Sequence, residues 1–95
     1  MKYLLDLGFN EETVNILNKN IPALAIEILN KKEELVTINI KYLIGFGVSN
    51  YVDVFVKFYN MFLMENKDFD EIFSKYDRED LVAKLEKNVA IMEYL

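Results

Sequence analysis

The chain has 95 residues, of which 53% are hydrophobic, so we expect one small domain spanning 1–95, and the composition argues against intrinsic disorder. It has no cysteine and no histidine, so disulfides, thiolate nucleophiles and the commonest general base and metal ligands are missing, and we expect a non-enzymatic protein without cofactor or metal. The net charge of −5 disfavours nucleic acid and anionic membranes as partners, and Asp6 interrupts the apolar start that a signal peptide needs, so we expect a cytoplasmic protein.

Local start and stop signals divide the first half of the chain into four helices. Gly8 is typical of the residue just past a helix end, and Asn10 is a good N-cap for the helix that follows. Pro22 ends that helix and begins the next one, and Gly47 closes the fourth. The sequence therefore predicts helices over about 3–7, 10–19, 22–29 and 33–47.

The segment 50–65 is the most apolar part of the chain. Its polar residues Asp53, Lys57 and Asn60 recur at steps of four and three, so a helix would gather them into one narrow stripe. Together with Asn50, these three residues interrupt the apolar region 48–64 too often for a membrane span. We therefore expect 50–65 to be the central helix of the fold, with apolar neighbours on all its other sides.

Acidic residues mark two further helix starts, at Asp68 and Asp77, with helices to about Tyr76 and to the C-terminus. The same region, 66–77, also resembles a calcium-binding loop. However, Glu71 occupies the position where that loop needs glycine, and Asp77 occupies the last position, where the loop needs a glutamate. We interpret these acids as helix caps.

An internal repeat relates the two halves of the chain. Residues 3–10 align with 42–49 at an offset of 39, and 39–43 align more weakly with 88–92. This pattern predicts units over 3–41 and 42–87 with a C-terminal stub at 88–95. The predicted fold class is all-α: a compact bundle or a short right-handed helical-repeat array of five to six helices.

The first unit, with its Leu7-Gly8 turn, its helix, Pro22 and a longer helix that leads to Gly47, resembles a mitochondrial transcription termination factor (mTERF-like) repeat over about residues 3–50. That resemblance implies a curved helical solenoid that binds nucleic acid. The second unit departs from the pattern, because it has no proline after Tyr59 and carries an acidic insertion at 65–80.

Charge is distributed unevenly, since most of the net negative charge lies in the C-terminal half. We predict an interaction module that binds a protein partner, or itself as a homodimer, and an acidic surface that attracts a basic partner. This surface comprises Glu65, Asp68, Asp70, Glu71, Asp77, Glu79 and Asp80. One alternative is nucleic-acid binding through Lys31, Lys32, Lys41 and Lys57. Another is an acidic inhibitor that mimics nucleic acid.

Overall fold

The computed structural model describes residues 1–95 and consists of helices joined by short turns, which confirms the predicted all-α class. The α-helices are α1 (Glu11–Asn20), α2 (Ala23–Lys31), α3 (Glu33–Phe46), α4 (Tyr51–Phe58), α5 (Asn66–Ser74) and α6 (Arg78–Lys87). Three short 3-10 helices complete the fold: η1 (Lys2–Leu7), η2 (Tyr59–Leu63) and η3 (Val89–Tyr94). No helix combines the length and the apolar character that crossing a membrane requires.

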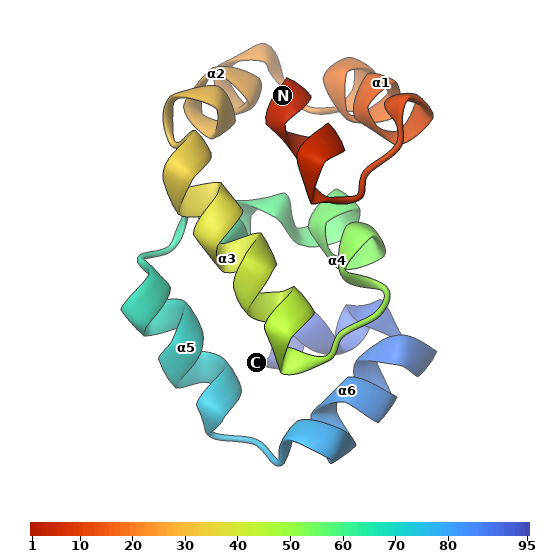
Figure 1. The fold of residues 1–95 in the computed structure, drawn as a ribbon, viewed down its shortest axis with the longest axis vertical. Coiled ribbons are helices and arrows are strands. Elements are labelled where there is room, and N and C mark those ends of the chain that lie inside the picture. Colours follow the sequence, from red (N-terminus) through yellow and green to blue (C-terminus); the bar gives the residue numbers. More distant parts are fainter.

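Helix α3 runs through the middle of the molecule and organises the other elements (Figure 1). It packs against η1, α2, α4, η2 and α5. The N-terminal elements η1, α1 and α2 lie at one end, whereas α5 and α6 lie at the other, where η3 packs against both α6 and α4. The acidic half and the N-terminal half of the chain are therefore presented at opposite ends of α3.

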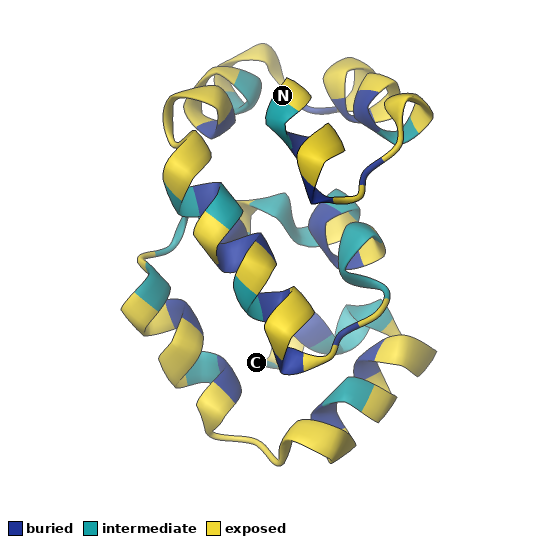
Figure 2. Cartoon of the chain, viewed as in Figure 1, coloured by how far each residue is buried: buried dark blue, intermediate teal, exposed yellow.

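Buried residues from every helix form one hydrophobic cluster of 20 side chains. A row of five phenylalanine rings, Phe9, Phe55, Phe62, Phe69 and Phe73, crosses this cluster. Successive ring centroids are 5.4, 5.0, 5.3 and 4.9 Å apart. These spacings are typical of favourable edge-to-face and tilted aromatic contacts. Buried positions face inward on each helix and exposed ones face outward, as Figure 2 shows.

The segment 50–65 forms two elements, which corrects the prediction of one continuous central helix. Helix α4 ends at Phe58, whose backbone leaves helical geometry at φ −130° and ψ 39°, and η2 follows. A helix that is apolar on nearly every side cannot bury all its faces in so small a molecule. The break redirects the chain, so that Val54 and Phe55 are buried before it and Phe62 after it. The amphipathic helix α3 takes the central position instead.

The C-terminal helices also begin and end differently from the prediction. The predicted cap at Asp77 is confirmed, because its carboxylate accepts a hydrogen bond from the Asp80 amide over 3.1 Å. The predicted cap at Asp68 is wrong, because α5 already begins at Asn66. The last predicted helix stops at Lys87, and Asn88 begins η3 by accepting a hydrogen bond from the Ala90 amide.

The two aligned glycines, Gly8 and Gly47, end their helices with the same geometry. Their φ angles are 94° and 105°, in the left-handed region that favours glycine. In both turns the amide that follows the glycine donates to the carbonyl five residues earlier, over 3.1 Å. The leucines at the second position of each aligned segment, Leu4 and Leu43, are fully buried. Further along, the alignment pairs Ile16, which is 45% exposed, with the fully buried Phe55.

Candidate interaction surface

The acidic face is a set of exposed carboxylates on α5, on α6 and in the turns that precede these helices. It consists of Glu65, Asp68, Asp70, Glu71, Asp77, Glu79 and Asp80. Phe69, Phe73 and Leu81 attach this part of the chain to the core, and each is 0–2% exposed. The segment 65–80 holds seven acidic and three basic residues, so it carries most of the net charge of −5. The predicted acidic residues therefore lie on a firmly packed end of the molecule.

Most carboxylates of the acidic face have no cation bound to them within the chain. The two ion pairs of the structure are Lys31–Glu27 and Lys84–Asp80, at 3.2 and 3.0 Å, and only the second involves this face. Asp77 caps α6, and Asp70 accepts a hydrogen bond from the Tyr42 hydroxyl over 2.7 Å. Most of these carboxylates are thus exposed to solvent and outside ion pairs.

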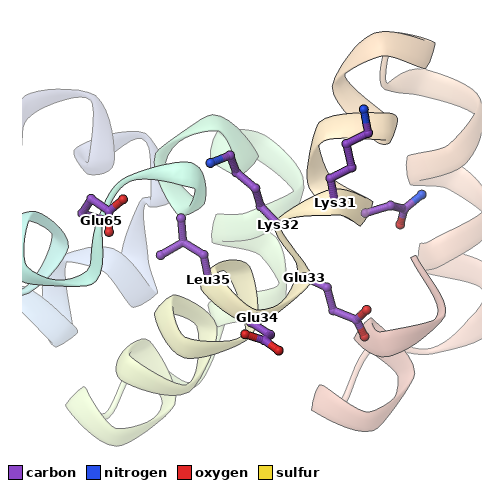
Figure 3. Close-up of a pocket in the computed structure, with 7 residues that line it drawn as sticks. Lys31, Lys32, Glu33, Glu34, Leu35 and Glu65 are labelled. Atoms are coloured by element: carbon purple, nitrogen blue, oxygen red, sulfur yellow. The ribbon is translucent and has the colours of Figure 1, made fainter.

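The predicted basic residues Lys31 and Lys32 lie at the junction of α2 and α3, in a cleft of about 450 Å³. Glu33, Glu34 and Glu65 line the same cleft, and Figure 3 shows Glu65 on a neighbouring segment across from the junction. Three carboxylates therefore line the same cleft as these two lysines, and the cleft has no uniformly positive wall.

Lys41 lies in a second cleft, which we call the α3–α5–α6 cleft. It has a volume of about 320 Å³, and its lining consists of Lys41, Tyr42, Gly45, Phe46, Asp70 and Arg78. The fold thus places one predicted basic residue, Lys41, and one predicted acidic residue, Asp70, in the same cleft. Lys57 is exposed on α4 and lines neither cleft. The four predicted lysines are accordingly divided among separate surroundings.

Arg78 also lines this cleft, although it was not among the predicted site residues. Its guanidinium lies 5.6 Å from the centroid of the Phe46 ring, within the range of a cation–π contact. Arg78 is the only arginine in a chain that otherwise uses lysine as its basic residue. This bias in composition was the one signal in the sequence that marked Arg78 out.

Two tyrosines at helix contacts hold their protons more tightly than free tyrosine. Burial, followed by the hydrogen bond to Asp70, raises the pKa of Tyr42 from 10.0 to about 12, although the charge of Arg78 acts in the opposite direction. Burial, followed by the charge of Glu33, raises the pKa of Tyr3 to about 12. The Tyr3 hydroxyl donates to the Leu29 carbonyl over 2.9 Å and thereby ties η1 to α2.

The raised pKa values of these tyrosines predict that the protein loses stability at alkaline pH. The unfolded chain loses the Tyr42 proton near pH 10.0 and the folded chain near pH 12, so the folded state binds more protons in between. The free energy of unfolding should fall as pH rises across this interval. Urea unfolding at several pH values measures the slope, and Tyr42→Phe should make it shallower. Tyr94→Phe, at a side chain 80% exposed, is the control; an unchanged slope in Tyr42→Phe would contradict the prediction.

The segment that resembles a calcium loop is mostly helical, because Asn66–Ser74 forms α5. The first candidate ligand, Asn66, points inward and donates to the Asn39 side chain over 3.0 Å. A helix projects its side chains away from its axis and cannot wrap them around a cation as a calcium loop does. The acidic side chains of this segment are exposed at the outer surface.

The surface as a whole offers charged groups on rigid helices, with clefts in which both signs of charge meet. Such groups suit recognition of another molecule, because exposed charges guide association and packed helices fix their positions.

Comparison with protein-family models, with curated proteins and with solved structures gives no match to this chain.

Proposed function

We propose that this chain is a non-enzymatic interaction module that binds a basic protein partner through its acidic face. The observation that carries the proposal is the unpaired state of that face: of its seven exposed carboxylates, only Asp80 lies in an ion pair. Exposed charges that their own chain leaves unpaired are available to a partner of opposite charge. They accelerate encounter and set orientation more than they add affinity.

The packing beneath the acidic face supports the same function. Phe69 and Phe73 on α5 belong to the row of phenylalanine rings, and Leu81 fixes the start of α6 in the core. Surfaces of rigid elements bind with little loss of conformational entropy. A partner with correspondingly spaced lysines or arginines would therefore meet carboxylates that are already in position.

The alternative, nucleic-acid binding by an mTERF-like repeat, has one supporting observation. The matched turns at Gly8 and Gly47, with the helix break at Pro22 between them, give η1 to α3 the order of elements that the resemblance implies. Its basic residues count against it. Lys31 is paired with Glu27, Lys32 lines a cleft with three glutamates, and Lys41 lies in a different cleft, so the lysines form no continuous basic surface. Neighbouring carboxylates oppose the approach of phosphates. An acidic inhibitor that mimics nucleic acid would use the acidic face itself.

The test neutralises part of the acidic face. The variant combines Asp68→Asn, Glu71→Gln and Glu79→Gln, whose carboxylates are exposed and outside the ion pairs. Tagged protein is incubated with cell lysate at low and at high salt, with and without nuclease, and bound proteins are identified by mass spectrometry. We expect a partner that the parent chain retains at low salt after nuclease treatment and that the triple variant loses.

The matched control combines Asp6→Asn, Glu12→Gln and Glu93→Gln, which change the net charge equally on exposed residues elsewhere. This control should retain the partner. Equal retention by both triple variants would refute a role for the acidic face, and retention that nuclease abolishes would favour the nucleic-acid alternative. Light scattering of the unbound protein over a range of concentrations separates self-association from binding of another protein.

A further inference from the structure

The α3–α5–α6 cleft contains two cations that no carboxylate neutralises directly. Lys41 comes from α3 and Arg78 from the first position of α6, and neither takes part in an ion pair. Asp70 is the only acidic residue in the lining, and one of its oxygens already accepts a hydrogen bond from the Tyr42 hydroxyl. The lining therefore has a net positive charge within an otherwise acidic end of the molecule.

The same cleft has an aromatic wall and open space beside it. The rings of Tyr42 and Phe46 are stacked, with centroids 6.0 Å apart and an angle of 25° between their planes. Gly45 lies between them in sequence, and a Cβ added there would meet no other heavy atom within 4 Å. The missing side chain therefore leaves open space within the lining of the cleft.

We propose that the α3–α5–α6 cleft binds a carboxylate carried on an aromatic or apolar body. The carboxylate would lie between Lys41 and Arg78. A guanidinium can donate two parallel hydrogen bonds to the two oxygens of a carboxylate. The body would lie over Gly45 against the aromatic wall. A volume of about 320 Å³ is at the lower end of the range for small-ligand pockets. This site takes the opposite charge from the acidic face and can be tested without a partner protein.

Two pairs of probes separate the carboxylate from the rest of the ligand. Benzoate is compared with benzamide, and N-acetylphenylalanine with its C-terminal amide, by titration into isotope-labelled protein and NMR detection of the backbone amides. We expect each carboxylate to shift the amides of Gly45 and Arg78, with dissociation constants on the order of millimolar for such small molecules. Binding by benzoate identifies free organic acids as sufficient, whereas binding by N-acetylphenylalanine alone identifies the C-terminus of a peptide.

Substitutions in the cleft test its residues. Lys41→Gln and Arg78→Gln should each weaken binding about fivefold, as expected for one charge-assisted contact near solvent. Lys67→Gln, an equal charge change at an exposed residue of α5 outside the cleft, should have no effect. Gly45→Leu should block the space over the rings and abolish binding while the protein remains folded, because nothing crowds that position. Equal binding of each carboxylate and its amide, or binding unchanged by Gly45→Leu, would overturn the proposal.

Discussion

Replacing Gly8 by alanine is expected to lower the free energy of unfolding by about 2–3 kcal/mol. Two costs add at this position. The backbone has a φ of 94°, which strains any residue with a Cβ. The Tyr51 hydroxyl, which donates to the Leu7 carbonyl over 2.7 Å, also lies where the new Cβ would be. The substitution therefore combines backbone strain with displacement of a hydrogen bond that joins α4 to the N-terminal turn.

The other two glycines provide matched controls for Gly8→Ala. Gly47 has a similar φ of 105°, but a Cβ there would meet only the Val82 side chain at 3.8 Å, so Gly47→Ala should cost about 1 kcal/mol. Gly45 lies inside α3 with open space around it, so Gly45→Ala should stabilise the protein by about 0.5–1 kcal/mol. Urea denaturation followed by circular dichroism measures all three.

A double mutant separates the two costs at Gly8. Tyr51→Phe removes the hydroxyl that the new Cβ would meet, so in that background Gly8→Ala should cost only as much as Gly47→Ala. If Gly8→Ala cost the same with and without the Tyr51 hydroxyl, the predicted contact would be wrong. If Gly8→Ala and Gly47→Ala were equal in the parent chain, backbone strain alone would account for both.

Replacing Asn39 by leucine is expected to destabilise the protein by about 2–4 kcal/mol, although leucine is apolar and similar in size. Asn39 is the one fully buried polar side chain of the fold. Its amide nitrogen donates to the carbonyls of Phe62 and Met64 over 3.0 and 2.8 Å, and its oxygen accepts from the Asn66 side chain over 3.0 Å. Leucine would leave these three groups without their partner. Asn18→Leu, on the exposed surface of α1, is the control and should change stability by less than about 0.5 kcal/mol.

Asn39→Asp should give a pH-dependent version of the same defect. A carboxylate there would face two carbonyl oxygens in a buried site, so its folded-state pKa should lie above the ordinary value of about 3.9. The folded state then binds the proton more tightly than the unfolded chain. Stability should be highest in acid and should fall as pH rises above about 4. A pH-independent cost in Asn39→Asp, or a stable Asn39→Leu, would contradict the role assigned to this network.

The network of Asn39 stabilises the end of η2, on the C-terminal side of the region 50–65. The 3-10 helix η2 ends within this region, and a helix end leaves carbonyl groups without partners. The Asn39 side chain on α3 donates to the carbonyls of Phe62 and Met64 and so stabilises this helix end, which the apolar sequence of 50–65 does not indicate. The repeat alignment places Asn88 opposite Asn39, but Asn88 is exposed and begins η3. Equivalent residues in the sequence therefore have different environments in the fold.

Features that depend on a few neighbouring residues could be predicted from the sequence alone. Asn10 caps α1 through the Thr13 amide at 2.7 Å, and Asp77 caps α6 in the same way, because these bonds span only three residues. The glycine turns at Gly8 and Gly47 are local for the same reason. The all-α class and the exposure of the acidic residues followed from this local chemistry together with helical periodicity.

Which groups come together from distant parts of the sequence is a property of the packed fold. Lys41, Asp70 and Arg78 line the same α3–α5–α6 cleft. The sequence had suggested a basic surface for Lys41 and an acidic surface for Asp70. Tyr42 and Asp70 form a hydrogen bond although 28 residues separate them. Contacts at such distances depend on how the helices pack, and packing depends on the summed fit of all buried side chains. Periodicity identifies the buried face of each helix, but not the helix that will cover it.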